Sequence, residues 1–161
     1  MAIGCASLDG PVGWITVFVE GGAVLALEWG RAGETAPGEG LDAAVAELER
    51  YFDGEPVRFT VPVRPARGAF RQRVWRRLAA IPWGATVSYG ARAAELGTAP
   101  RAVAGACAKN PIPIIIPCHR VVAAAGGLGG YSGGDGTETK LALLALEGVE
   151  LPRLPRPAAA A

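Results

Sequence analysis

The chain has 161 residues and a mass of 16.5 kDa, and 50% of its residues are hydrophobic while 19% are charged. This composition can bury a core and excludes a disordered chain, and the length suits one ordinary domain or two small ones. The formal net charge of +1 hides an asymmetry: residues 1–55 carry ten acidic and two basic side chains, whereas residues 58–120 carry eleven basic side chains and one acidic side chain, Glu95.

The first third of the chain predicts a three-stranded antiparallel sheet and one helix. Strands are expected over 2–8, 14–20 and 23–29, with a turn at 9–11 and a glycine hairpin turn at 21–22. Apolar residues at 41, 45, 48 and 52 follow one face of a helix, which Asp53-Gly54 ends. The proline-rich stretch 55–65 predicts an extended connector. We therefore place a small α/β domain at 1–65.

The remainder predicts short helices. Apolar side chains recur at helical spacing from Phe70 to Ile81, and Pro82-Trp83-Gly84 ends that helix. Ser88 is expected to cap a helix over 89–96, and Thr98 to cap the next one. Two short helices joined by a tight glycine-containing turn are typical of a helix-turn-helix. The second helix carries small residues that allow either a close backbone approach or close helix packing: Ala102, Ala104, Gly105 and Ala106.

The end of the chain predicts a buried extended segment over 112–117, a glycine-rich loop over 126–136 and a last helix over 137–147. Together these elements form a mostly helical, winged-helix-like domain at 66–151, so the fold class is α+β. Residues 152–161 are expected to be a disordered tail.

The basic segment 58–120 indicates a polyanion-binding surface, although solvated helix faces in an arginine-rich chain explain it equally well. No charge-free stretch approaches the roughly 20 apolar residues of a membrane helix, and the first residues lack the pattern of a signal peptide. The three cysteines are too few and too irregularly spaced for a disulfide framework, which predicts a reduced, cytoplasmic protein.

Metal binding is not expected. The chain has three cysteines and one histidine. A mixed zinc site of four ligands would need all of them, at spacings that match no known pattern. We expect no metal and no cofactor.

The clearest chemical signal is that the only histidine, His119, follows Cys118 directly and precedes Arg120. A thiol with an ordinary pKa of about 8.5 needs a base or a positive field to become a nucleophile. Neighbouring side chains do not normally point the same way, which favours a relay through one water or a tight turn after Pro117 over direct thiol–imidazole contact. The alternative is a buried structural thiol, a role that fits Cys5 and Cys107 better.

The segment Ile116-Pro117-Cys118-His119-Arg120-Val121 resembles the active-site signature of the O6-alkylguanine-DNA alkyltransferases, also called methylated-DNA–protein-cysteine methyltransferases. The resemblance runs from about Leu48 to Gly148. It includes the ordered motifs Tyr51-Phe52-x-Gly54, Phe70–Trp75, Ile81-Pro82-x-Gly84, Ser88-Tyr89, Arg101-Ala102-Val103, Asn110-Pro111, Tyr131-Ser132-Gly133-Gly134 and Leu144–Gly148. It implies an α/β N-terminal domain and a helical C-terminal domain with a helix-turn-helix, in agreement with the elements above.

The resemblance implies that Cys118 attacks the alkyl carbon on guanine O6, that His119 is its base through a water, and that Glu147 orients His119. Asn110 would brace the active-site turn, or simply stop a helix. Tyr89 would donate a hydrogen bond to the departing guanine, or be a core tyrosine. Three further positions would line the base pocket: Val121, Tyr131 and Ser132.

The resemblance also implies that the second helix of the helix-turn-helix enters the DNA minor groove, with Thr98, Ala102 and Gly105 at the interface. Arg101 would fill the gap left by a flipped nucleotide, or contact a phosphate. Compared with the family pattern, Gly97–Arg101 is shorter, Asp135–Thr139 is longer, and Arg92 replaces an apolar residue.

The predicted function is therefore repair of double-stranded DNA by irreversible transfer of an alkyl group from O6-alkylguanine to Cys118, with O4-alkylthymine as an open second substrate. A thioether has no ready hydrolytic route, so each chain reacts once. The protein is expected to be a monomer without an obligatory protein partner, cytoplasmic and nucleoid-associated when acting. Three alternatives stay open: a non-enzymatic lesion sensor of the alkyltransferase-like class, a cysteine hydrolase using Cys118 and His119, and a helix-turn-helix regulator.

Overall fold

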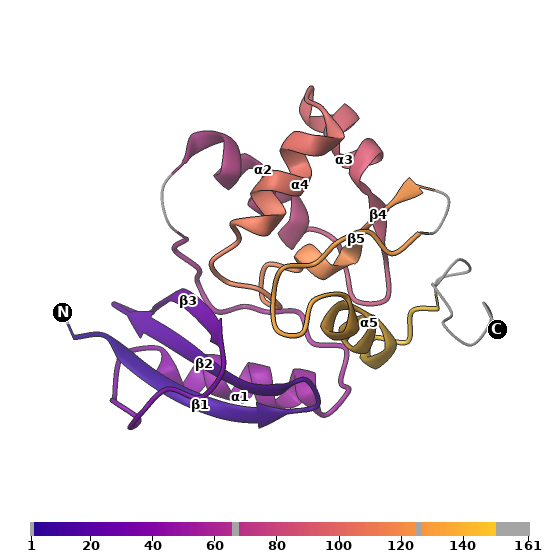
Figure 1. Ribbon diagram of the computed structural model, residues 1–161. Helices are drawn as coiled ribbons and strands as arrows, with labels where there is room; N and C mark the ends of the chain where they lie inside the picture. Colours follow the sequence, from indigo (N-terminus) through magenta and orange to yellow (C-terminus); the bar gives the residue numbers. More distant parts are fainter. Residues whose placement is uncertain (1, 66–67, 125–126, 151–161) are drawn as a thin grey trace.

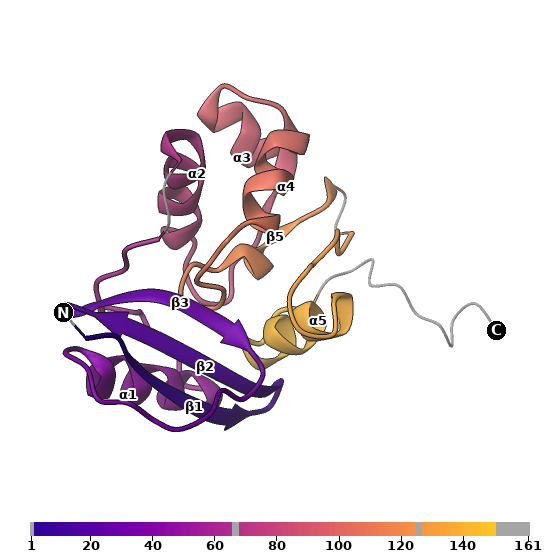
Figure 2. The same ribbon diagram turned by 60° about the vertical axis from the view of Figure 1, so that its left-hand side comes forward.

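The computed structural model describes residues 2–65, 68–124 and 127–150, so the tail predicted at 152–161 lies outside the described residues. The N-terminal unit is the predicted antiparallel sheet, with strands β1 (Gly4–Gly10), β2 (Gly13–Glu20) and β3 (Ala23–Trp29) in the order β1-β2-β3. Helix α1 (Leu41–Phe52) packs against β1 and β2. Figures 1 and 2 show α1 on one side of the sheet and most of the C-terminal helices on the other.

The first two strand boundaries differ from the prediction because pairing continues further along the chain. Asp9 pairs with Trp14 and Gly10 with Gly13, which leaves Pro11-Val12 as the turn in place of 9–11. The predicted glycine hairpin between β2 and β3 is confirmed. Gly21 and Gly22 both have positive φ, 58° and 84°, a backbone conformation that matches the twist of the flanking strands.

The connector over 55–65 is extended, as predicted, and runs beside β3. The Val24 amide donates to the Pro62 carbonyl at 2.8 Å, and the Arg64 amide donates to the Val24 carbonyl at 2.8 Å. The connector thus adds backbone pairing to a sheet edge that would otherwise be open. The exact domain boundary at 65 stays a prediction.

The C-terminal unit contains α2 (Ala69–Ala79), α3 (Tyr89–Leu96), α4 (Pro100–Ala108) and α5 (Thr137–Leu146). Helices α3 and α4 form the predicted helix-turn-helix. Ser88 caps α3 by accepting a hydrogen bond from the Ala91 amide at 3.0 Å, and Gly97 ends α3 in the left-handed conformation. None of the helices in the described ranges is long and apolar enough to cross a membrane.

The predicted cap of α4 by Thr98 is wrong. The N-cap is Ala99, which makes no side-chain cap hydrogen bond, and Pro100 begins the helix. Proline pushes the residue before it into the extended region, and Ala99 has φ −100° and ψ 151°. The Thr98 amide instead donates to the Ala93 carbonyl at 2.9 Å and closes the end of α3.

Arg92, which replaces an apolar residue of the family pattern, is buried on α3. Its guanidinium donates to Glu95 at 2.6 Å, and Arg77 of α2 pairs with the same carboxylate. Burial, with the nearby charge of Arg77, lowers the pKa of Arg92. The ion pairs explain how a charged residue can occupy this position.

The segment over 112–117 is buried, as predicted, but it is not extended. The Ile116 amide donates to the Ile112 carbonyl and the Ile115 amide to the Pro113 carbonyl, both at 2.9 Å, which folds the segment into a tight turn. Ile114 is fully buried at the apex with φ +73°. A β-branched residue is strained in this region, and the apolar packing around Ile114 holds it there.

A single core cluster spans both units. The Leu27 amide of β3 donates to the Pro111 carbonyl at 2.9 Å, which attaches the 110–117 turn to the sheet. On the other side of the turn, the Trp75 indole of α2 donates to the Ala106 carbonyl of α4 at 2.9 Å. Ala106 therefore faces the core, and the small residues of α4 do not share one surface.

Candidate active site

Cys118 begins a short 3-10 helix, η1 (Cys118–Arg120), directly after the strained turn. The Asn110 side chain fixes this turn at two points. Its amide donates to the Ile116 carbonyl at 2.8 Å, and its carbonyl oxygen accepts from the Ile112 amide at 2.9 Å. Asn110 therefore braces the turn that presents Cys118, rather than only stopping α4.

Strand pairing just after η1 brings Tyr89 close to Cys118, and both side chains line one cavity. Strands β4 (Val87–Ser88) and β5 (Val121–Val122) pair in parallel, with Val87 opposite Val121. Tyr89 follows β4 directly, so its side chain reaches the segment that carries Cys118. The sequence did not predict this short sheet, because two-residue strands leave no periodic pattern.

A cavity of about 360 Å³ opens beside Cys118, a size that suits a planar base. Its walls come from α3, α4, η1 and the glycine-rich loop: Tyr89, Ala104, Cys107, Ala108, Cys118, Gly130, Tyr131 and Ser132. A second cavity of about 380 Å³ shares Cys107, Cys118, Tyr131 and Ser132 and extends to β3. Cys107, expected to be only structural, thus lines both cavities.

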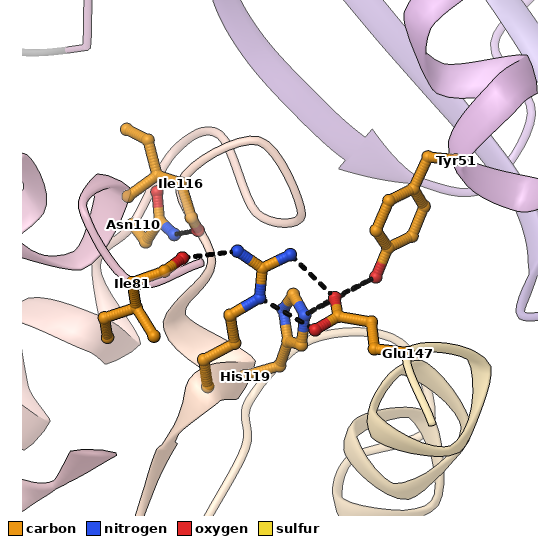
Figure 3. A network of polar contacts seen from close by, with 7 residues as sticks. Tyr51, Ile81, Asn110, Ile116, His119 and Glu147 are labelled. Carbon is orange, nitrogen blue, oxygen red and sulfur yellow. Dashed lines mark hydrogen bonds and ion pairs between the residues drawn. The ribbon is translucent and has the colours of Figure 1, made fainter. Parts of the chain in front are cut away.

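His119, Arg120 and Glu147 form a buried polar cluster, and Figure 3 shows His119 and Glu147 facing one another within it. His119 Nε2 lies 2.6 Å from Glu147 Oε2. The Arg120 guanidinium donates to both carboxylate oxygens, through Nε at 2.8 Å and Nη2 at 2.9 Å, and through Nη1 to the Ile81 carbonyl at 2.6 Å. This bidentate pairing fixes the orientation of the Glu147 carboxylate.

The charges in the cluster set the protonation states. Burial alone would raise the pKa of Glu147, but hydrogen bonds from His119 and Arg120 lower it to about 2. An ionised carboxylate only accepts, so His119 Nε2 carries a proton and donates it to Glu147. Burial, with the charges of Arg120 and Lys140, lowers the pKa of His119, against the opposing effect of Glu147. His119 is thus neutral near pH 7, with Nδ1 as an acceptor.

Two buried polar atoms of the site lack a strong hydrogen-bond partner among the described residues: His119 Nδ1 has none, and the Tyr131 hydroxyl has only the weakly accepting thiol of Cys118. Buried polar groups are nearly always satisfied, so such atoms mark places for water or ligand. Burial raises the pKa of the Cys118 thiol, while hydrogen bonding by Asn110 and the charge of Lys140 act in the opposite direction. The thiol therefore needs a base to become a thiolate.

Lys140 is a member of the site that the sequence did not reveal. It is fully buried on α5, and its Nζ donates to the Val121 carbonyl at 2.7 Å and to the Gly130 carbonyl at 3.0 Å. Nζ also lies 3.4 Å from the Tyr89 hydroxyl. Burial lowers the pKa of Lys140 to about 8. Lys140 thereby ties the segment after Cys118 to the loop at Gly130 that lines the cavity.

The predicted DNA-contacting residues lie on and before α4. Arg101 and Gly105 are exposed, and Thr98 and Ala102 are half-buried. Ala104 and Ala108 are exposed on the same helix and line the first cavity. The exposed small-residue face of α4 therefore leads to the mouth of the cavity that contains Cys118.

Comparisons with known proteins agree with this geometry. The family described as "6-O-methylguanine DNA methyltransferase, DNA binding domain" matches residues 69–149. The methylated-DNA–protein-cysteine methyltransferase of Saccharolobus islandicus (strain L.S.2.15) is 40% identical over 144 residues, 88% of this chain and 93% of that protein. The Mycobacterium leprae protein of the same name is 40% identical over 154 residues, 90% of this chain and 92% of that protein.

Solved structures give the same answer. A crystal structure of Mycobacterium tuberculosis OGT in complex with DNA superposes with a TM-score of 0.77 and 40% identity, over 89% of this chain and 92% of that one. An O6-methylguanine-DNA methyltransferase from Pyrococcus kodakaraensis superposes with a TM-score of 0.57 and 28% identity, over 92% of this chain and all (100%) of that one.

Fold, site and relatives together define a DNA-binding transferase that uses a cysteine. The chain belongs to the methylated-DNA–protein-cysteine methyltransferase family, and it is an enzyme of DNA alkyl repair. The predicted fold class, a two-part α+β protein with a helix-turn-helix, is confirmed.

Proposed function

We propose that this protein binds double-stranded DNA, turns O6-alkylguanine out of the helix and transfers the alkyl group to Cys118 in a single, irreversible turnover. The observation that carries the proposal is the position of Cys118, which lines a base-sized cavity and directly precedes a histidine with a free buried nitrogen. The opening of that cavity beside the exposed small residues of α4 supports entry of the base from bound DNA.

Thiol activation is assigned to His119. With Nε2 held by Glu147, the unpaired Nδ1 is an acceptor, and one water between Nδ1 and the Cys118 thiol completes the relay. Proton transfer through this water forms the thiolate and a His119 imidazolium. Glu147 stabilises that cation and keeps the ring oriented.

The transfer forms one bond and breaks one bond. The Cys118 thiolate attacks the alkyl carbon, the carbon–O6 bond breaks, and guanine leaves with the electron pair. The Tyr89 hydroxyl is assigned to meet the developing negative charge on the base. Burial, with the nearby Cys107 and Cys118, raises the pKa of Tyr89 to about 12, which keeps it a donor. The thioether product is not hydrolysed, so the protein reacts once.

The base is assigned to the cavity walls formed by Tyr131 and Ser132. Val121, the third predicted pocket residue, is fully buried and lines neither of the two cavities beside Cys118. Burial and the neighbouring Cys118 raise the pKa of the Tyr131 hydroxyl and keep it protonated, so it can donate a hydrogen bond to a ligand. The Lys140 bonds to the Val121 and Gly130 carbonyls hold the segment after Cys118 against the loop that lines the cavity. The chemistry of these groups suits a purine.

The interface with DNA is assigned to α4 and the residues before it, with Thr98, Ala102 and Gly105 against the sugar-phosphate backbone. A Cβ built on Gly105 meets nothing within 4 Å, so the surface there is open to a partner. Exposed Arg101 is assigned to fill the gap left by the flipped nucleotide, which would offset part of a flipping cost of a few kcal/mol. A free thiol nucleophile requires a reducing compartment, which supports a cytoplasmic location.

The proposal is tested with duplex DNA that carries one tritiated O6-methylguanine. The wild-type protein and the matched control Cys5→Ser should take up the label, because Cys5 lies in β1 away from both cavities. Cys118→Ser should bind the same duplex without taking up label. Uptake of label by Cys118→Ser would show that Cys118 is not the methyl acceptor. Wild-type protein that binds the lesion selectively but takes up no label would favour a lesion sensor.

A further inference from the structure

One side chain of the N-terminal unit enters the active-site cluster. Tyr51 of α1 is fully buried, and its hydroxyl donates to Glu147 Oε2 at 2.6 Å (Figure 3). Its ring is held by three aromatic neighbours at centroid distances of 5.4–5.7 Å: Phe52, Phe59 and Trp83. The hydroxyl therefore has little freedom to leave the carboxylate.

The donors are distributed unevenly over the two carboxylate oxygens. Oε2 accepts from Tyr51, from His119 Nε2 and from Arg120 Nη2, whereas Oε1 accepts from Arg120 Nε. The oxygen that stabilises a protonated His119 is thus shared with a second and a third donor. Each donor on the same oxygen reduces the negative charge available to the imidazolium.

We infer that Tyr51 is a positioning residue for alkyl transfer: by donating to Glu147 Oε2, its hydroxyl keeps His119 neutral and aligned at lower pH than the His119–Glu147 pair alone would allow. The inference rests on the proposed function, in which neutral His119 is the base for Cys118. It gives the N-terminal unit a part in the chemistry, because α1 supplies the hydroxyl.

The charged groups that face His119 determine whether its pKa rises or falls when the Tyr51 hydroxyl is removed. Arg120 of η1 and Lys140 of α5 oppose a second positive charge, Glu147 favours it, and the neighbouring Cys118 and Tyr131 are neutral when protonated. Removal of the Tyr51 hydroxyl leaves these groups in place but frees one lone pair of Oε2. Glu147 then stabilises the imidazolium more strongly, and the pKa of His119 rises.

The single histidine makes the test direct. In protein labelled with ¹⁵N-histidine, the imidazole signals of the chain come from His119 alone, and they report both its tautomer and its titration. The variants are Tyr51→Phe, which keeps the ring, and the control Thr60→Val. Thr60 donates its hydroxyl to the buried carboxylate of Glu47 on the same helix, so the control removes a comparable bond away from the site.

We expect the His119 titration to move upward by about one pH unit in Tyr51→Phe and to stay in place in Thr60→Val. The acid limb of the methyl-transfer rate should move equally, with about a tenfold loss in Tyr51→Phe well below the wild-type midpoint and no loss above pH 8. Identical titrations in Tyr51→Phe and wild type, or a rate loss that is uniform with pH, would overturn the inference.

Two further measurements separate the role of Tyr51 from the proposed function and from a folding defect. Wild-type protein that transfers no methyl group would refute the proposed function, whereas the ¹⁵N titration would still decide whether Tyr51 acts on His119. If Tyr51→Phe fails to fold, wild-type spectra provide the test. A slowly exchanging Tyr51 hydroxyl proton with a cross-peak to the His119 ring is expected, and its absence would contradict the inference.

Discussion

Replacement of Glu147 by glutamine tests the central ion cluster. The side chain keeps its shape but loses its charge, and the NH2 group that replaces one carboxylate oxygen cannot accept from Arg120. From the lowering of the Glu147 pKa from 4.5 to about 2, the ionised carboxylate contributes about 3 kcal/mol to the free energy of unfolding. Breaking a buried pair costs a similar 3–5 kcal/mol. We expect Glu147→Gln to lose about 3 kcal/mol at pH 7, measured by urea denaturation.

The pH dependence of wild-type stability also reports on the contribution of the Glu147 carboxylate. The folded pKa of Glu147 is lowered, so its stabilisation is fully present above the unfolded value of about 4.5 and is lost as the pH falls towards 2. The variant should lack this contribution to acid unfolding. Its methyl-transfer rate should fall about a hundredfold, because His119 loses the partner that orients it and stabilises its cation.

The control is Glu47→Gln. Glu47 is a buried carboxylate that accepts from Thr60 and the Val61 amide and lies outside the cluster. It should lose stability while it keeps the transfer rate per folded molecule. A Glu147→Gln protein within 1 kcal/mol of wild type, with an unchanged rate, would refute the reasoning.

Three further changes probe the DNA face and the cavity. Binding of undamaged duplex should weaken with salt with a log–log slope near −4 to −5, as about four to six phosphate contacts predict, and a flat response in a salt titration would contradict a basic docking surface. Arg101→Ala should slow transfer from duplex DNA about tenfold or more while sparing a single-stranded substrate, and equal losses on both would exclude a role in flipping. Gly129→Ala places a Cβ 2.9 Å from the Tyr89 ring at a backbone φ of +75°, so stability and transfer should both fall, in contrast to the control Gly33→Ala, whose Cβ meets nothing within 4 Å.

The sequence predicted most of the fold because its local signals agreed with the tertiary structure. Gly21-Gly22 can form only a tight hairpin, and Ser88 and Gly97 mark both ends of α3. Where a local signal competed with a neighbour, the prediction was wrong. Pro100 imposed its own helix start and displaced the cap from Thr98 to Ala99.

The site was only partly predictable for the same reason. The Cys118-His119 pair and Asn110 lie within one short stretch, so a motif can carry them. Tyr51 and Lys140 come from distant elements, and their roles depend on which atoms they meet after folding. A tyrosine on an apolar helix face and a lysine in a leucine-rich helix look like a core residue and a surface residue in the sequence. Only the structure brings the tyrosine hydroxyl to Glu147 and buries the lysine.

Intact-protein mass spectrometry tests the central claim most directly. The protein is incubated with excess duplex DNA that carries O6-methylguanine, and the modified peptide is then mapped. Replacement of the thiol hydrogen by a methyl group should add about 14 Da, saturate at one methyl group per chain and map to Cys118, as a stable thioether at a single nucleophile requires. An unchanged mass, a methyl group on another residue, or repeated turnover of DNA by unmodified protein would contradict the account.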